Sequence, residues 1–143
     1  MSALAILIDT DVLIDFLIDR KPFTKNSKEI IQKSRDGAVS AYMAAHSITN
    51  IFYILRKTYT VLERKKRLLD LCKFINVVDI KNELIINALT NKNDDIEDNL
   101  QIECACAINA DYIITRNIEH YKNSKIPVML PQDFLGLLNS KTN

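Results

Sequence analysis

The feature that most constrains the fold is an apolar run, Leu4–Ile8, that stops at Asp9 and resumes at Val12. Consecutive apolar residues ending in acids, followed by helix-period residues, are typical of a strand buried in a parallel sheet. Such a strand delivers its acids to the carboxyl edge of the sheet, where open α/β sheets bind ligands. Burying Asp9 there costs free energy unless a cation or hydrogen-bond donors compensate it, so Asp9 is the first candidate functional residue.

Strand and helix patterns alternate along the rest of the chain, and only two glycines and three prolines interrupt them. This pattern predicts long helices, short loops and a parallel sheet flanked by helices. The predicted strands lie at residues 4–8, 38–40, 74–78, 112–115 and 127–129. The predicted helices lie at residues 10–18, 25–35, from about 43, 62–72, 81–90, from about 95, and near 134–138.

Length and composition limit the number of domains and the functions that the chain can have. With 143 residues the chain fits one domain over residues 1–143, and its net charge of +1 indicates neither a nucleic-acid nor a membrane partner. Three cysteines without a Cys-x-x-Cys pair, together with two histidines, argue against zinc. No signal-peptide pattern or membrane-length apolar run is present, so we expect a soluble, cytoplasmic protein with no membrane contact.

Asp9 also has a structural interpretation, because a carboxylate after a strand commonly caps the next helix. Thr10 or Asp11 can serve as that cap instead, which leaves Asp9 available for function. We expect Asp11 to brace the turn that presents Asp9, and Asp15 to lie in solvent.

A second acidic site lies in Asn93–Gln101. Asp94 and Glu97 have the spacing of a capping box, and acids in a first turn favour the helix dipole. Asp98 is not explained in this way. Ile102 continues its face, so the Asp98 carboxylate is expected beside the inward side of the helix.

A third polar group, Thr115, Asn117 and Glu119, follows the strand at 112–115. Thr115 and Asn117 offer neutral oxygens, or alternatively a helix cap, which is also the preferred interpretation of Glu119. Together with Asp9 and Asp98 they form an oxygen-only set suited to Mg²⁺ or Mn²⁺. Gathered carboxylates repel one another unless a divalent ion neutralises them, and such an ion promotes phosphodiester hydrolysis.

The order and spacing of these motifs resemble the PIN domain family of metal-dependent ribonucleases, which includes VapC-type toxins of bacterial toxin–antitoxin pairs. The resemblance covers nearly the whole chain. The matching motifs are Ile8–Leu13, Val39-Ser40, Asp95–Gln101, Ile113–Asn117 and Pro131–Leu135.

The resemblance implies a three-layer α/β/α fold with a central, mostly parallel sheet of four to five strands. It also implies an endoribonuclease in which three or four acids surround Mg²⁺ or Mn²⁺. By matching position, Asp9 is the first acid and Asp98 the third. Thr115 falls where the family has a Ser or Thr lining the site. The implied partners are an RNA substrate and a cognate antitoxin protein, with a homodimer as a further arrangement.

The sequence departs from the family pattern at two acid positions. The second acid falls on Asn50 and the fourth on Asn117. An Asn oxygen can ligate Mg²⁺ but supplies no charge, which leaves Asp95 or Glu119 as additional metal-ligand candidates beside Asp9 and Asp98.

The sequence leaves two alternative functions open. Asn50 and Asn117 favour a PIN-like module that binds RNA or protein without efficient cleavage. The Asp-x-Asp after the first strand is also found in phosphohydrolases of the haloacid dehalogenase type, in which Asp9 would be the nucleophile. The Gly that usually follows the second Asp of that family is absent here.

Basic and aromatic residues offer further contact candidates. Residues 56–67 are rich in Arg and Lys, which suits RNA phosphates and a solvated helix face equally. Tyr42, His46, Thr49 and Tyr53 are expected on one helix stripe. This stripe suits base stacking, a dimer or antitoxin contact, or ordinary partial burial.

Overall fold

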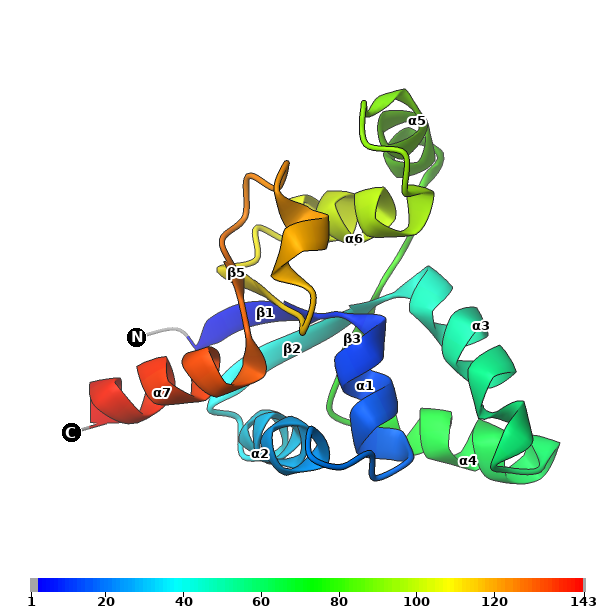
Figure 1. The fold of residues 1–143 in the computed structure, drawn as a ribbon, viewed down its shortest axis with the longest axis vertical. Coiled ribbons are helices and arrows are strands. Elements are labelled where there is room, and N and C mark those ends of the chain that lie inside the picture. Colours follow the sequence, from blue (N-terminus) through cyan, green and yellow to red (C-terminus); the bar gives the residue numbers. More distant parts are fainter. Residues whose placement is uncertain (1–2, 143) are drawn as a thin grey trace.

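The computed structural model describes residues 3–142, and its centre is one parallel sheet. The strands are β1 (Leu4–Ile8), β2 (Val39–Ala44), β3 (Asn76–Val78), β4 (Tyr112–Ile114) and β5 (Val128–Met129). They are ordered β3-β2-β1-β4-β5, and every pairing is parallel (Figure 1). The predicted sheet of four to five mostly parallel strands is confirmed.

Helices cover both faces of this sheet. The α-helices are α1 (Thr10–Leu17), α2 (Thr24–Arg35), α3 (Ala45–Ile54), α4 (Val61–Leu71), α5 (Asn82–Thr90), α6 (Ile96–Ala107) and α7 (Pro131–Thr142). Two short 3₁₀ helices, η1 (Leu55–Lys57) and η2 (Ile118–Tyr121), complete the set. The three-layer α/β/α arrangement expected from the family resemblance is therefore present.

The alternation of side chains along β1 explains the two hydrophobic cores. Ile6 and Ile8 join a core with residues of α1, α2, α3, α4 and α7, whereas Leu7 joins a separate core with residues of α5 and α6. Successive strand residues point to opposite faces, so an uninterrupted apolar run is required when both faces are covered.

The central position of β1 determines where polar residues can meet. From β1 the chain proceeds outward through β2 and β3, then returns to place β4 on the other side of β1. Ile8 pairs with Ile114, and the Asp9 amide donates to the Ile114 carbonyl at 2.9 Å. The carboxyl ends of β1 and β4 therefore form the topological switch point, the usual ligand site of open α/β sheets.

One predicted boundary was wrong near β2. The strand continues to Ala44 and α3 begins at Ala45, whereas the sequence pattern predicted a helix from about Met43. Met43 and Ala44 are buried in a strand between two neighbours, where apolar residues fit as well as on a buried helix face. Tyr42 consequently lies in β2 and does not share a helix stripe with Tyr53.

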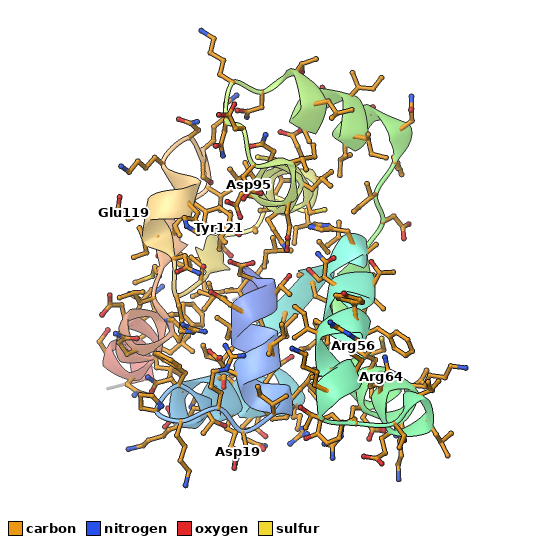
Figure 2. The ribbon with its side chains drawn as sticks, turned by 45° about the vertical axis from the view of Figure 1, so that its right-hand side comes forward. Asp19, Arg56, Arg64, Asp95, Glu119 and Tyr121 are labelled. Carbon is orange, nitrogen blue, oxygen red and sulfur yellow. The ribbon has the colours of Figure 1, made fainter. Side chains whose placement is uncertain are left out.

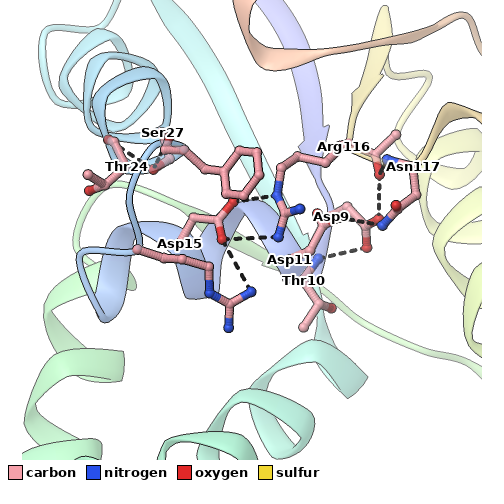
Figure 3. A network of polar contacts seen from close by, with 11 residues as sticks. Asp9, Thr10, Asp11, Asp15, Thr24, Ser27, Arg116 and Asn117 are labelled. Atoms are coloured by element: carbon pink, nitrogen blue, oxygen red, sulfur yellow. Dashed lines mark hydrogen bonds and ion pairs between the residues drawn. The ribbon is translucent and has the colours of Figure 1, made fainter.

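Asp15 does not lie in solvent as predicted. Its side chain is 1% exposed and accepts two hydrogen bonds from Arg116, Nε to Oδ2 at 2.7 Å and Nη2 to Oδ1 at 3.2 Å. Arg20 lies 3.6 Å from Oδ1, and the Arg116 guanidinium stacks 3.9 Å from the Phe23 ring centre (Figure 3). The reason is tertiary, because this face of α1 packs against the loop that follows β4.

Candidate functional site

Asp9 combines a helix cap with a place at the switch point. It is 8% exposed and is the N-cap of α1. Its Oδ1 accepts from the Thr10 amide at 2.7 Å, and its Oδ2 accepts from the Thr115 hydroxyl at 2.7 Å. The expectation that Thr10 or Asp11 replaces Asp9 as the cap was wrong. Each of these oxygens has a second lone pair, which leaves further acceptor capacity for a ligand.

Thr115 and Asn117 organise the loop after β4 around these acids. The Thr115 hydroxyl accepts from the Asn117 amide at 3.0 Å, and the Asn117 side-chain amide donates to Asp11 Oδ2 at 2.7 Å (Figure 3). Burial and the charge of Asp9 raise the pKa of Asp11 from 3.8 to about 7, against the lowering effect of Arg116. Asp11 thus links the turn after β1 to this loop, and the Asn117 side chain makes no helix-capping bond.

Helix α6 brings further carboxylates to the same region. Its N-cap is Asp95, whose Oδ1 accepts from the Asp98 amide at 3.1 Å, so the capping box predicted for Asp94 and Glu97 is not formed. Burial raises the pKa of Asp98 to about 6, and the charges of Asp95 and Asp9 add to this effect. The carboxylate of Asp98 therefore lies within the electrostatic influence of Asp9.

Glu97 lies near the candidate site, and the sequence interpretation missed it. Burial raises the pKa of its carboxyl, as do the charges of Asp9 and Asp95, while a hydrogen bond from Asn50 lowers it. The neutral Asn50 of α3 is thus beside a carboxylate of α6. The available signal was the number of acids between residues 94 and 98, since one helix N-terminus needs only one capping acid.

Tyr121 was also missed, because an aromatic residue in this pattern resembles ordinary core. It is 2% exposed, and burial and the charges of Asp9 and Asp98 raise its pKa. A side-chain hydrogen bond with Asp9 acts in the same direction, so the hydroxyl keeps its proton. Tyr121 is the last residue of η2, which lies beside α6 (Figure 2).

The outer edge of the site is polar and open. Asp95, Asp98 and Glu119 line a pocket of about 330 Å³ with Asn93, His120, Lys122 and Asn123. His120 Nδ1 lies 3.7 Å from Asp98 Oδ2. The Glu119 side chain is 80% exposed and pairs with Lys122 at 3.0 Å, on the outer side of η2 (Figure 2). We call Asp9, Glu97 and Asp98, whose charges act on one another, the inner group; Asp98 also borders this pocket, and Asp95 and Glu119 lie at its rim.

The donor set matches the chemistry of a hydrated divalent ion. Within residues 3–142, no three Asp, Glu, His or Cys side chains are close enough together to hold a metal ion by themselves. Mg²⁺, however, commonly keeps several waters and uses only one or two carboxylates. Asp9 and Asp98 supply hard oxygen donors, and their mutual repulsion is the kind that a cation relieves.

The basic segment at residues 56–67 carries arginines stacked on aromatic rings. Arg56 lies 3.7 Å from the Tyr53 ring centre and Arg64 lies 4.3 Å from that of Phe52. Figure 2 shows both arginines on the α3 and α4 side of the molecule, apart from the carboxylates. Any contact of this segment with RNA phosphates is therefore separate from the candidate metal site.

The raised pKa values predict how the stability of the metal-free protein depends on pH. A carboxyl with a raised pKa holds its proton more tightly in the fold. Its stabilising contribution is full below about pH 4 and is lost as the pH rises through about 6 for Asp98 and about 7 for Asp11. We expect the free energy of unfolding to fall between about pH 4 and 7 in urea titrations with a chelator present.

Asp98→Asn provides the matched control for this pH dependence. It removes the titrating group, so the fall in unfolding free energy should become shallower near pH 6. A stability that rises with pH across this range, or the same slope in the variant, would contradict the assignment.

None of the helices in the described part of the chain is long and apolar enough to cross a membrane.

Comparisons with known proteins agree with this architecture. Residues 5–119 match the sequence profile of a family described as PIN domain. A search of curated proteins finds no match.

Several solved structures share the fold. A chain of VapBC-1 from nontypeable Haemophilus influenzae aligns with a TM-score of 0.66 and 13% identity, covering 90% of this chain and 99% of that one. A chain of a toxin–antitoxin complex from Klebsiella pneumoniae aligns with a TM-score of 0.65 and 18% identity, covering 91% of this chain and 98% of that one. A chain of VapBC2 from Rickettsia felis, solved with a DNA fragment from the VapBC2 promoter, aligns with a TM-score of 0.64 and 12% identity. The alignment covers 89% of this chain and 98% of that one. At these identities the likeness concerns the fold.

Proposed function

This chain belongs to the PIN domain family, and from that premise we propose that it is a Mg²⁺- or Mn²⁺-dependent endoribonuclease acting as a cytoplasmic toxin of a toxin–antitoxin pair. The observation that carries the proposal is the hydrogen-bonded pair Asp9 and Thr115 at the switch point of the sheet, with the charge of Asp9 acting on Glu97 and Asp98 of α6. Carboxyls whose pKa is raised by partial burial and by neighbouring charges, as for Glu97 and Asp98, are a common sign of a functional site. Their oxygen-only chemistry favours a hard divalent ion.

We assign each residue a role on this basis. Asp9 and Asp98 hold the ion, and Thr115 orients Asp9 through its hydrogen bond. Glu97 adds negative charge beside the neutral Asn50. When bound, the ion would lower the pKa of water and stabilise charge on the phosphodiester.

Three positions have secondary roles in this proposal. Asn117 braces the site through Asp11 and supplies no charge. Asp95 caps α6, and Glu119 lies exposed at the rim, so both act at most on the outer coordination of the ion.

The test is RNA cleavage with added Mg²⁺ or Mn²⁺ and with chelator, followed on structured and unstructured RNAs. Asp98→Asn removes one charge from the inner group and is expected to lower the cleavage rate by about 100-fold. Asp133→Asn is the matched control, since Asp133 is exposed in the first turn of α7. Equal cleavage by both variants, or none by the wild type with any metal and RNA tested, would contradict the proposal.

A second candidate is a PIN domain that binds RNA or protein without cutting it. It is favoured by the neutral Asn50 and Asn117 and by the lack of a three-ligand cluster among residues 3–142. Metal-independent RNA binding without cleavage would select this candidate. Family membership argues against the haloacid dehalogenase-type alternative, which would instead trap Asp9 as an aspartyl-phosphate when a small phosphate monoester is supplied.

An antitoxin is the protein partner we propose, at an apolar groove between α3 and α4. The groove, of about 520 Å³, is lined by Ile48, Thr49, Phe52, Lys65, Leu68, Leu69 and Cys72. Leu69 is 66% exposed, and Lys65 lies at the edge with Lys66 beside it. This combination suits an amphipathic helix with apolar and acidic residues. The relatives with this fold include toxin–antitoxin complexes.

Co-expression with the product of an adjoining small reading frame tests this partner. We expect the two proteins to elute together in size-exclusion chromatography and Leu69→Glu to prevent this. Co-elution that is unaffected by Leu69→Glu would place the partner elsewhere. A homodimer is a separate proposal, supported by the exposed Ile86 and Leu89 of α5, and the molar mass of the isolated protein from light scattering tests it.

A further inference from the structure

A buried network of three polar side chains joins three helices beneath the candidate site. The hydroxyls of Thr10 in α1 and Ser47 in α3 form a hydrogen bond of 2.9 Å. The side-chain amide of Gln101 in α6 donates to both hydroxyls, at 3.3 Å to Thr10 and 3.0 Å to Ser47. Thr10 is 6% exposed, and the other two residues are fully buried.

Two members of this network hold α1 and α6 together near the acids. Thr10 directly follows Asp9, and its amide donates to Asp9 Oδ1 at 2.7 Å. Gln101 lies three positions after Asp98 in α6, and residues at this spacing share one face of a helix. The hydrogen bond from Gln101 to Thr10 therefore ties the face of α6 that carries Asp98 to the first turn of α1.

Ser47 adds α3 to this arrangement. It lies three positions before Asn50, so the two residues share one face of α3. The Ser47 hydroxyl contacts both other members of the network. The network thus joins α1, which Asp9 caps, to the helices that carry Asn50 and Asp98.

Stability alone does not explain a polar network at this place. Gln101 Oε1 is buried and has no hydrogen-bond partner among residues 3–142. Burying an unpaired polar atom costs free energy, and apolar side chains of the same shape would avoid this cost. Buried hydrogen-bond networks also restrict their members to one geometry, which apolar contacts do less strictly. The network is therefore better suited to fix the arrangement of the three helices than to increase stability.

We propose that Thr10, Ser47 and Gln101 are positioning residues, which hold Asp9, Asn50 and Asp98 in one fixed arrangement at the switch point of the sheet. The inference rests on the proposed function and deepens it, since it names the residues that set the geometry of that site. A displacement of about 1 Å among reacting groups can lower a rate by about 100-fold. Loss of one hydroxyl from the network is therefore expected to slow cleavage in a protein that still folds.

Variants that remove one hydroxyl test this role through kcat for RNA cleavage. Thr10→Val keeps the shape of the side chain without its hydroxyl, and we expect it to lower kcat by about 10-fold with KM unchanged. Thr10→Ser returns the hydroxyl and should restore most of kcat. Ser47→Ala should lower kcat as Thr10→Val does. Ser34→Ala is the matched control, because Ser34 is 8% exposed and donates to the Phe74 carbonyl at 2.6 Å, in a helix to which we assign no site residue.

Backbone amide chemical shifts provide a second readout, which requires no activity. Two-dimensional NMR spectra of the full chain without RNA are compared for the wild type, Thr10→Val and Thr10→Ser. The Asp98 amide donates to Asp95 Oδ1, so its shift reports on the first turn of α6. We expect the amide signals of Asn50 and Asp98 to move in Thr10→Val and to stay near their wild-type positions in Thr10→Ser.

The outcomes separate this inference from the proposed function. Wild-type kcat in Thr10→Val and Ser47→Ala, or an equal loss in Ser47→Ala and Ser34→Ala, would overturn the positioning role while RNA cleavage stands. If the wild type cleaves no RNA, the proposed function fails and the NMR comparison decides the inference. Unmoved Asn50 and Asp98 signals in Thr10→Val would then overturn it, and signals that move only in that variant would support it. If Thr10→Val does not fold, Ser47→Ala and Ser34→Ala provide the same comparison in both measurements.

Discussion

Replacing Asp9 with Asn is expected to lower metal-dependent RNA cleavage by about 1,000-fold, the largest effect of any single change at the site. Asp9 is the most central carboxylate, since its charge acts on Glu97, Asp98 and Tyr121. The asparagine keeps the shape of the side chain and removes the charge. Initial cleavage rates over a range of Mg²⁺ and Mn²⁺ concentrations measure the loss.

The fold is expected to survive this change. The Asn oxygen can still accept from the Thr10 amide, and its NH₂ group can donate to Thr115. Because Asp9 raises the pKa of Asp11, removing its charge relieves repulsion, and the thermal midpoint should stay the same or rise. A lower midpoint that parallels the activity loss would indicate unfolding rather than loss of a metal ligand.

Asp11→Asn is the informative comparison two residues away. Asp11 accepts a hydrogen bond from the Asn117 side chain, and an Asn oxygen can continue to accept it. We therefore expect a far smaller loss of cleavage than in Asp9→Asn. Equal losses in the two variants would contradict the division between a ligand at Asp9 and a brace at Asp11.

Local sequence patterns were enough to predict the strand ending at Asp9. The run Leu4–Ile8 is apolar throughout because helices cover both faces of β1, and this requirement is visible in five consecutive residues. The order of strands was not visible in the sequence. It depends on which strands pair after long connections, and only this order places Thr115 beside Asp9.

The residues that were misassigned or missed are those whose surroundings come from distant parts of the chain. Glu97 has the position of a helix-start acid, and no local pattern indicates that the charge of Asp9 acts on Glu97 and Tyr121. Asp15 has the helical spacing of a solvent-facing acid, yet its partner Arg116 is 101 residues away in the chain. Helix periodicity reports which face is polar but not what covers that face.

That long-range pair gives the largest expected effect on stability. Replacing Arg116 with Ala is expected to reduce the free energy of unfolding by about 3 kcal/mol, because it leaves the buried Asp15 charge without its closest partner. Arg20, at 3.6 Å, compensates only in part. The variant also loses the stacking of Arg116 on Phe23. Urea denaturation monitored by circular dichroism measures the change.

Arg116→Lys and a double-mutant cycle distinguish the ion pair from packing. Lysine keeps the charge but cannot make the bidentate contact with Asp15. The stability of Arg116→Lys should therefore lie between that of the wild type and that of Arg116→Ala. In the double variant Asp15→Ala/Arg116→Ala, no buried carboxylate remains, so the loss should be smaller than the sum of the two single losses. Additive losses would mean that Arg116 contributes through its contact with Phe23 and not through Asp15. The loop carrying Thr115 and Asn117 would then be held to α1 by packing rather than by charge.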